Sequence, residues 1–194
     1  MTVPIRPAVP IRPAVTIRPA VTIRPAVPTD AAVLAVLAAG TFALACPPDT
    51  TAESIRDYIA ANLSEECFVG YLADPARDIR LALADGLPAG YTMLLFGEPN
   101  DTDAAAAITL HPTVELSKVY LLGEYHGVGI AAPLMAETLD VARSRGAVGV
   151  WLGVNEHNAR AIRFYEKSGF VLVGAKTCMV GPDLQHDHVM ERAL

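Results

Sequence analysis

The chain has 194 residues, which is enough for one domain with a sizeable hydrophobic core. Apolar residues make up 52 % and charged residues 19 %, and this composition excludes an intrinsically disordered protein. The net charge of −6 argues against nucleic-acid binding through a basic face, so we expect no nucleic-acid partner. The cysteines are far apart and the histidines are not clustered, which favours reduced thiols in a cytoplasmic protein and no metal site.

A repeated pentapeptide, Ile-Arg-Pro-Ala-Val, occupies the N-terminal region, with copies that begin at Ile5, Ile11, Ile17 and Ile23. Proline in every copy prevents a helix and removes a hydrogen-bond donor from any strand. The copies are too few to bury the core of a solenoid. We therefore expect residues 1–21 to be a flexible arm and residues 22–194 to be a single folded domain, with its first strand at residues 22–26.

Residues 31–46 form an uncharged apolar stretch that follows several arginines. Such a stretch is either a buried helix or a secretion signal. Thr29 and Asp30, at its start, are good helix N-caps, and the stretch is too short to span a membrane comfortably. We therefore favour a buried helix in a protein without a membrane partner.

The middle of the chain predicts a helix followed by strands. Thr50 and Glu53 have the spacing of a capping box, and apolar residues continue at helical spacing to Leu63. The polar and alanine-rich residues 97–107 are expected to be a loop. Apolar runs separated by turn signals predict strands over residues 79–84, 89–96 and 111–122.

A glycine turn, His126-Gly127-Val128-Gly129-Ile130-Ala131, lies between the last of these strands and a helix expected over residues 131–145. Two glycines in such a turn let the backbone approach an anionic ligand, and the helix directs its free N–H groups at that ligand. The turn therefore predicts a site for a phosphate-bearing cofactor. A dinucleotide fold is disfavoured because Ala132 stands where GxGxxG requires glycine, and no Gly-Lys-Ser/Thr sequence of a P-loop follows.

The C-terminal part continues the alternation of strands and helices. A strand is expected over residues 148–154, a helix from about Ala161 to Gly169, and a last pair of strands at residues 170–173 and 188–190. The fold class is therefore α+β, a mixed α/β arrangement with a βαβ unit around the glycine turn.

This region contains two motifs. The first is Tyr120-Leu121-Leu122-x-x-Tyr125-His126-Gly127-x-Gly129-Ile130-Ala131, and the second is Asn158-x-x-Ala161-Ile162-x-Phe164-Tyr165-x-x-x-Gly169-Phe170. Together they closely resemble the motifs of the GNAT superfamily of N-acetyltransferases. The resemblance covers residues 22–194. It implies a central, mostly antiparallel sheet with one parallel, splayed strand pair, flanked by helices. The chain departs from the pattern at His126, where the family usually has Arg or Gln.

The resemblance implies acetyl-CoA as co-substrate and assigns residues to bind it. The backbone of Val119, Tyr120 and Leu121 would pair with the pantetheine arm. Asn158 would bind the cofactor near the splayed strand, and Tyr165 would lie near the thioester sulfur. The remaining cofactor-binding residues form the phosphate loop: His126, Gly127, Val128, Gly129, Ile130, Ala131 and Ala132.

Acetyl transfer requires that an amine lose a proton and that the leaving thiolate be protonated. A tyrosine, with an ordinary pKa of about 10, stays protonated at neutral pH and can donate to a thiolate, so Tyr165 is the expected general acid. The alternative is that Tyr165 only packs in the core. Glu115 is the expected base and Glu156 the second candidate, unless Glu115 is a solvent-facing partner of Lys118 or a water chain removes the proton.

The expected acceptor is a small-molecule primary amine, of which a polyamine or another cationic amine is one class. The N-terminal half resembles, less specifically, the bacterial spermidine/spermine acetyltransferase group. Acidic residues also gather on the helices of the expected acceptor side, although a solvated helix face explains them equally: Asp49, Glu53, Asp57, Glu65 and Glu66. Protein or peptide amines, a catalytically silent acyl-CoA-binding regulatory module and an exported lipoprotein are the alternatives. Such folds often pair, so a homodimer is a further expectation.

Overall fold

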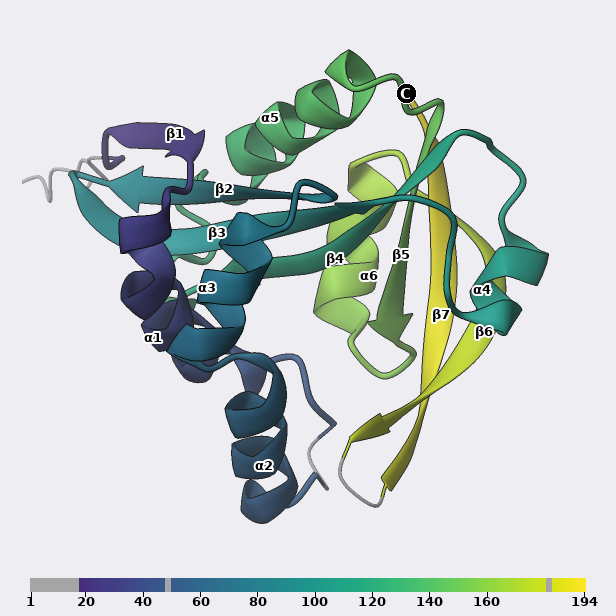
Figure 1. Ribbon diagram of the computed structural model, residues 1–194, viewed down its shortest axis with the longest axis horizontal. Coiled ribbons are helices and arrows are strands. Elements are labelled where there is room, and N and C mark those ends of the chain that lie inside the picture. The colour runs from purple at the N-terminus through teal and green to yellow at the C-terminus, as the bar shows by residue number, and fades with distance from the viewer. Residues whose placement is uncertain (1–17, 48–49, 181–182) are drawn as a thin grey trace, which may run out of the picture.

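The computed structural model describes residues 18–47, 50–180 and 183–194 of the chain. These residues form one seven-stranded sheet in the order β1-β2-β3-β4-β5-β7-β6, with helices on both faces (Figure 1). The strands are β1 (Val21–Pro25), β2 (Arg77–Ala84), β3 (Leu87–Phe96), β4 (Thr113–Leu121), β5 (Gly149–Asn155), β6 (Val171–Val180) and β7 (Asp183–Ala193). The helices are α1 (Ala31–Phe42), α2 (Ala52–Asn62), α3 (Glu65–Ala73), α4 (Thr102–Ala107), α5 (Ala131–Ser144) and α6 (Ala159–Lys167), with short 3-10 turns η1 (Pro28–Asp30) and η2 (Gly123–Tyr125).

Strand pairing agrees with the expected mixed fold. Among the described strands only β4 and β5 run parallel, and the other neighbours are antiparallel. Alternate residues of β2 and β3 face opposite layers, so that Leu81 and Tyr91 pack against α1 and α3 while Ala82 packs against α5. A second core lies between α5, α6 and the strands β4, β5 and β7. The prediction of a mostly antiparallel sheet with one parallel pair is confirmed.

The uncharged stretch after Asp30 folds as α1 and packs in the core through Leu34, Leu37 and Phe42. Within the described residues, no helix combines the length and the apolar character that a bilayer crossing requires. Asp30 occupies the N-cap position of α1, but its carboxylate accepts hydrogen bonds from Arg24 and from the backbone N–H of Val27 instead of capping the helix.

The first strand begins at Val21, one residue before the expected start. Ala20 already contacts the domain, because its N–H donates to Asp85 Oδ1 at 2.9 Å and its carbonyl accepts from Asp85 N–H at 2.9 Å. Most of the predicted N-terminal arm, residues 1–17, lies outside the described residues.

Sequence patterns missed two helices and misplaced one cap. Residues 102–107 of the predicted loop form α4, because Asp101 caps the helix by accepting from Ala104 N–H at 2.9 Å. Ser64 starts α3 in the same way. The cap of α2 is Thr51, which accepts from Ser54 N–H, and not the predicted pair Thr50 and Glu53.

The last hairpin is much longer than predicted. Residues 170–173 and 188–190 are only its base, since β6 extends to Val180 and β7 begins at Asp183. Polar residues such as Lys176 and Asp187 interrupt the apolar pattern, and this interruption hid the strands from a reading based on hydrophobicity. Asp187 lines the main cavity described next, and Lys176 lines a smaller one beside it.

Candidate active site

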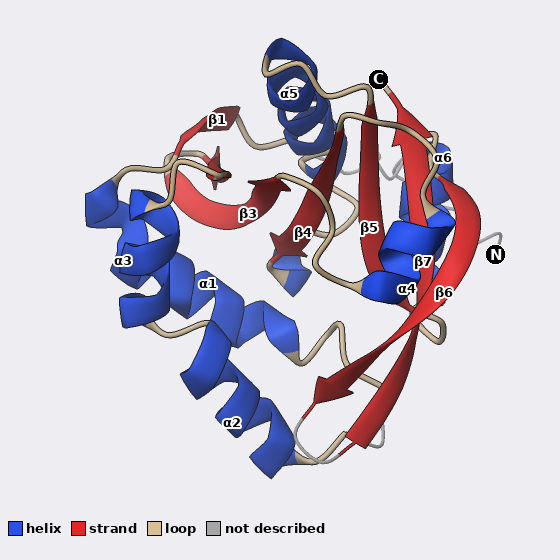
Figure 2. Cartoon of the chain, turned by 45° about the vertical axis from the view of Figure 1, so that its right-hand side comes forward, coloured by secondary structure: helices blue, strands red, loops and turns tan. Residues whose placement is uncertain are grey.

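Strands β4 and β5 separate at the centre of the sheet. Their parallel ladder pairs Thr113, Val114 and Glu115 with residues 149–151 and then ends, although both strands continue. On its other side β4 stays paired with β3 as far as Leu121. Figure 2 shows the two strands running side by side at one end and diverging towards the other. The backbone of residues 117–121 therefore has an edge towards β5 without a strand partner among the described residues.

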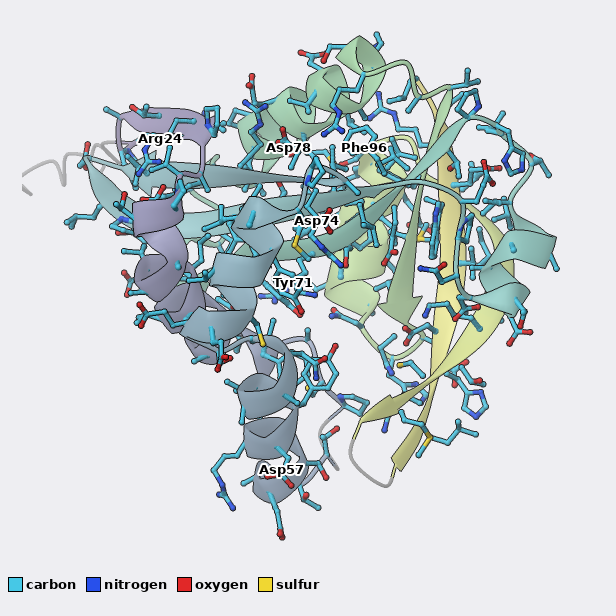
Figure 3. All side chains as sticks on the ribbon, viewed as in Figure 1. Arg24, Asp57, Tyr71, Asp74, Asp78 and Phe96 are labelled. Carbon is cyan, nitrogen blue, oxygen red and sulfur yellow. The ribbon has the colours of Figure 1, made fainter. Side chains whose placement is uncertain are left out.

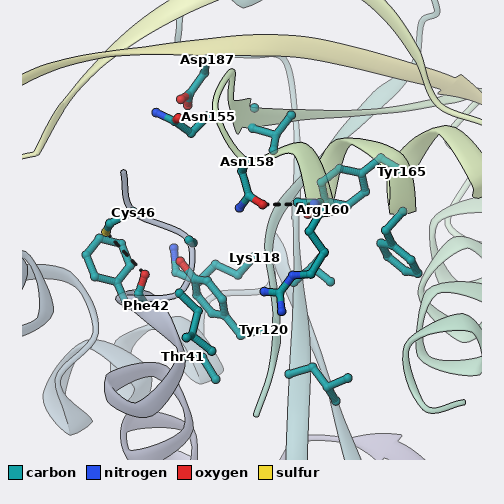
Figure 4. A pocket seen from close by; sticks show the side chains of 18 of the residues that line it. Thr41, Phe42, Cys46, Lys118, Tyr120, Asn155, Asn158, Arg160, Tyr165 and Asp187 are labelled. Carbon is teal, nitrogen blue, oxygen red and sulfur yellow. Dashed lines mark hydrogen bonds between the residues drawn. The ribbon is translucent and has the colours of Figure 1, made fainter. Parts of the chain in front are cut away.

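A cavity of about 440 Å³ fills this opening. We call it the main cavity. It extends from the glycine turn and the start of α6 to the end of α1 and the β6–β7 hairpin, so segments far apart in the sequence share it (Figure 4). The predicted site residues that line it are Val119, Tyr120, Leu121, His126, Gly127, Ala131, Asn158 and Tyr165.

The glycine turn leads directly into α5. Gly127 has φ +78° and Gly129 has φ +97°, a region in which side chains are strained, so both glycines are required by the backbone. Ile130 occupies the N-cap position and offers no side-chain hydrogen bond to the helix. The N–H groups of the first turn are therefore available to a ligand, together with the positive end of the helix dipole.

The remaining predicted residues of the turn, Val128, Gly129, Ile130 and Ala132, are not among those that line the main cavity. Ile130 is fully buried against α5 and β2. If these residues bind a ligand, they would do so through their backbone groups and not through their side chains.

The ring of His126 is held by a hydrogen bond at each of its nitrogens. Its Nε2 lies 2.9 Å from the carbonyl oxygen of Leu121, and its Nδ1 is hydrogen-bonded to the guanidinium of Arg160. Because a guanidinium only donates, Nδ1 must accept and Nε2 must carry the proton that is donated to Leu121. The positive charge at this end of the main cavity therefore comes from Arg160, at the start of α6, and not from His126.

Asn158 is the N-cap of α6, and Tyr165 lies about two turns further along the same helix. Asn158 caps α6 by accepting from Ala161 N–H at 3.1 Å, which leaves its amide N–H groups free towards the main cavity. Tyr165 is buried beside Phe164 and Phe170, and burial raises its pKa far above the ordinary value. Its hydroxyl is therefore protonated at neutral pH, and within the described residues it has no hydrogen-bond partner.

The end of the main cavity near the hairpin is polar. Asp187 on β7 is paired with Asn155 on β5, and Figure 4 shows the two side chains close together. Asp187 Oδ2 lies 3.7 Å from Cys178 Sγ, and Asn155 donates to Gln185 at 3.3 Å. Burial raises the pKa of Asp187, and nearby Lys176 opposes this shift. Burial next to Asp187 also raises the pKa of Cys178 to about 11.

The predicted base, Glu115, lies outside the main cavity. It lines a smaller cavity of about 140 Å³ together with Asp101 and Lys176. Burial raises its pKa, and Lys176 and Lys118 lower it. Lys118 itself lines the main cavity, and burial lowers its pKa against the opposing effect of Glu115. Glu115 is thus a mostly buried neighbour of Lys118 and not a solvent-facing residue.

The other acidic candidates are exposed and do not line the main cavity. Glu156 is on the surface beside His157. Asp57 lies on α2, at the end of the molecule away from α5 (Figure 3). The remaining helix residues of the predicted acidic face, Glu53, Glu65 and Glu66, are also exposed, and Asp49 lies outside the described residues. The carboxylate of the main cavity is Asp187, which sequence patterns did not single out.

This combination of fold and site, a sheet that opens beside a glycine turn at the start of a helix, is the arrangement of the acetyltransferase class. Comparisons with known proteins agree. A model of the acetyltransferase (GNAT) family matches residues 42–170. An uncharacterized N-acetyltransferase of Mycobacterium tuberculosis is 48 % identical over 166 residues, which cover 86 % of this chain and 99 % of the relative.

Solved structures show the same fold at low identity. The PaiA N-acetyltransferase of Thermoplasma acidophilum, in complex with coenzyme A, has a TM-score of 0.71 at 20 % identity and covers 90 % of this chain and 99 % of its own. An acetyltransferase of Salmonella typhimurium with its cofactor acetyl-CoA has a TM-score of 0.60 at 21 % identity, with 90 % and 94 % covered. The chain belongs to the GNAT family and is an N-acetyltransferase.

Proposed function

We propose that this N-acetyltransferase transfers the acetyl group of acetyl-CoA to the primary amine of a small cationic acceptor, by direct attack in a ternary complex. The observation that carries the proposal is the opening between β4 and β5, which ends in the main cavity. The backbone groups of its unpaired strand edge can form hydrogen bonds with the amide groups of a pantetheine arm. The N–H groups at the turn before α5 can bind a pyrophosphate.

The residues present fit the proposed co-substrate. Asn158, at the start of α6, and Tyr165, within it, both line the main cavity, as do residues 116–121 of β4. A thioester bound along the unpaired edge of β4 would bring its sulfur towards Tyr165. As the amine nitrogen bonds to the carbonyl carbon and the carbon–sulfur bond breaks, the Tyr165 hydroxyl would give its proton to the sulfur. The proton that the amine loses would return to Tyr165 through water and restore its hydroxyl.

Direct attack is favoured over an acetylated enzyme. Cys46 and Cys178 line the main cavity, but burial raises the pKa of both thiols, so they remain protonated and are poor nucleophiles at neutral pH. The acceptor amine must then reach the thioester itself. It would enter from the hairpin end, opposite the phosphate loop.

Asp187 supports a cationic acceptor, because a half-buried carboxylate in a cavity attracts an ammonium group. Lys118 also lines the main cavity, but its positive charge is partly balanced by the negative charge of Glu115 on the same strand. Glu115 remains a candidate base that would act through water or Lys176, since it lines the neighbouring cavity. Asp187 is the candidate that contacts the acceptor directly.

The test is release of free CoA thiol from acetyl-CoA in the presence of a panel of amines. The panel contains a diamine, a polyamine, an uncharged-tail monoamine, an amino acid and a peptide with a free N-terminus. We expect the fastest release with the diamine or polyamine and an acetylated amine by mass spectrometry. Faster release with the peptide would reassign the acceptor class. Tight cofactor binding without release for any amine would instead support a silent acyl-CoA-binding module.

A further inference from the structure

Arg18, in the repeat copy that begins at Ile17, lies next to Gly129 of the phosphate loop. The Nη1 atom of Arg18 is 3.9 Å from the position that a Cβ atom on Gly129 would occupy. Arg18 is exposed, but it is close to a fixed point of the chain, because Ala20 is hydrogen-bonded in both directions to Asp85. The backbone that carries Arg18 is thus held close to the pairing of β1 with β2, which begins at Val21 and Ala84.

The phosphate loop itself contributes no cationic side chain. The Nδ1 atom of His126 accepts a hydrogen bond from Arg160. The other residues of the turn, as far as Ala132, are apolar or glycine. Backbone N–H groups can hold a pyrophosphate, but cofactors that carry phosphates gain further affinity from a guanidinium, which matches phosphate oxygens with two parallel hydrogen bonds.

Two arginines supply this charge from outside the loop. Arg160 comes from the start of α6 and lines the main cavity, while Arg18 comes from the N-terminal repeat and lies at Gly129. We infer that Arg18 binds a phosphate group of CoA, so that the repeat segment completes the cofactor site of the domain. This inference rests on the proposed use of acetyl-CoA. It gives Arg18, which lies just before the first strand, a role in binding.

CoA offers two phosphate sources for this contact, the pyrophosphate and the 3′-phosphate of the ribose. Binding of CoA and of 3′-dephospho-CoA to the full chain, measured by calorimetry at low and moderate salt, separates them. The variants are Arg18→Gln and Arg18→Lys. The matched control is Arg143→Gln, which removes the same charge from the far end of α5, where Arg143 forms only an exposed pair with Asp140.

We expect Arg18→Gln to bind CoA on the order of tenfold more weakly, with a shallower salt dependence, and Arg18→Lys to be intermediate. Arg143→Gln should bind as the unaltered protein does. If the 3′-phosphate is the partner, Arg18→Gln and the unaltered protein will bind dephospho-CoA equally. If the pyrophosphate is the partner, the loss will be the same for both ligands.

Equal CoA affinity of Arg18→Gln and the unaltered protein, with unchanged melting temperatures, would overturn the inference. Turnover is measured alongside, so that a failure of the inference about Arg18 can be distinguished from a failure of the proposed function. Weakened CoA binding by Arg18→Gln, in a protein that acetylates no amine, would support the Arg18 contact and refute catalysis. No CoA binding by the unaltered protein would refute both.

Discussion

The side chain of Lys176 and the carboxylate of Asp187 meet over the bare Cα of Gly153. A Cβ atom at Gly153 would lie 2.7 Å from Lys176 Cε and 3.4 Å from Asp187 Oδ2. Lys176 continues across β5 to Asp101, with an Nζ–Oδ2 distance of 3.3 Å. The missing side chain at Gly153 thus lets a lysine of β6 pass over β5 and remain next to the carboxylate that lines the main cavity.

Gly153→Ala tests this arrangement. The φ angle of Gly153 is not in the left-handed region, so alanine suits the strand, and the flexible end of Lys176 can move away. We expect unfolding free energy to change by less than about 1 kcal/mol. The displaced lysine and carboxylate should raise KM for the amine several-fold while CoA affinity, measured by titration, stays constant. Unchanged amine kinetics would show that the Lys176–Asp187 arrangement has no part in acceptor binding.

Asp187→Asn removes the proposed ammonium contact and nearly preserves the shape of the side chain. We expect KM for a diamine to rise on the order of tenfold, since a charge-assisted hydrogen bond is lost, with little change in CoA affinity. Asp57→Asn, on the exposed face of α2, is the matched control and should behave as the unaltered protein.

The pH profile distinguishes this role from a structural one. Burial raises the pKa of Asp187, so the carboxylate forms only as pH rises above the ordinary aspartate range. For the unaltered protein, kcat/KM for the amine should therefore fall on the acid side with a pKa above that range. Asp187→Asn should lose this step. A profile of the same shape in both proteins would assign the acid limb to another group.

Tyr165→Phe removes one hydroxyl and retains the ring that packs against Phe164 and Phe170. We expect turnover to fall by about 10²-fold or more, because the leaving thiolate loses its proton donor, while CoA affinity changes little. Since burial raises the pKa of Tyr165 above the ordinary tyrosine range, the unaltered protein should show no basic decline from this group near neutral pH. Turnover equal to that of the unaltered protein would leave Tyr165 a packing role only.

Local signals in the sequence predicted the backbone around the glycine turn. The turn and the start of α5 are each defined by a few adjacent residues, and the structure has both. Backbone geometry of this kind follows from glycine and capping chemistry, which a sequence shows directly. The resemblance of the motifs then indicated how these local pieces combine.

The acceptor end depends on pairing between distant segments, and sequence patterns could not predict it. Asp187 reaches the main cavity because β7 pairs with β5, which brings it opposite Asn155. Glu115 is on the expected strand, but Lys176 from β6 lies beside it and both line a separate cavity. A local pattern carries no information on which strands become neighbours. It therefore placed Glu115 on the correct strand, β4, but did not show that Glu115 lines the smaller cavity beside Lys176.

The segment that carries Arg18 is joined to the domain by an ion pair whose contribution to stability depends on pH. Arg24 on β1 donates to both carboxylate oxygens of Asp30 at 2.7 and 2.8 Å, and Val27 N–H donates to the same carboxylate at 2.8 Å. Figure 3 shows Arg24 beside the start of α1. Asp30 is only 7 % exposed, so the loss of its charge would leave a partly buried guanidinium without its partner.

The hydrogen bond from Arg24 holds the pKa of Asp30 below its usual range. Because the folded pKa is the lower one, the stabilisation is complete above the unfolded pKa of about 4 and is lost as pH falls through the folded pKa. Asp30→Asn should therefore cost about 1–3 kcal/mol of unfolding free energy at pH 7, and clearly less at pH 3. Urea titrations at both pH values measure this. Asp140→Asn, which removes the exposed partner of Arg143, should cost less than about 1 kcal/mol at either pH. An equal loss for Asp30→Asn at pH 7 and pH 3 would mean that shape and hydrogen bonding, and not the charge of Asp30, join β1 to α1.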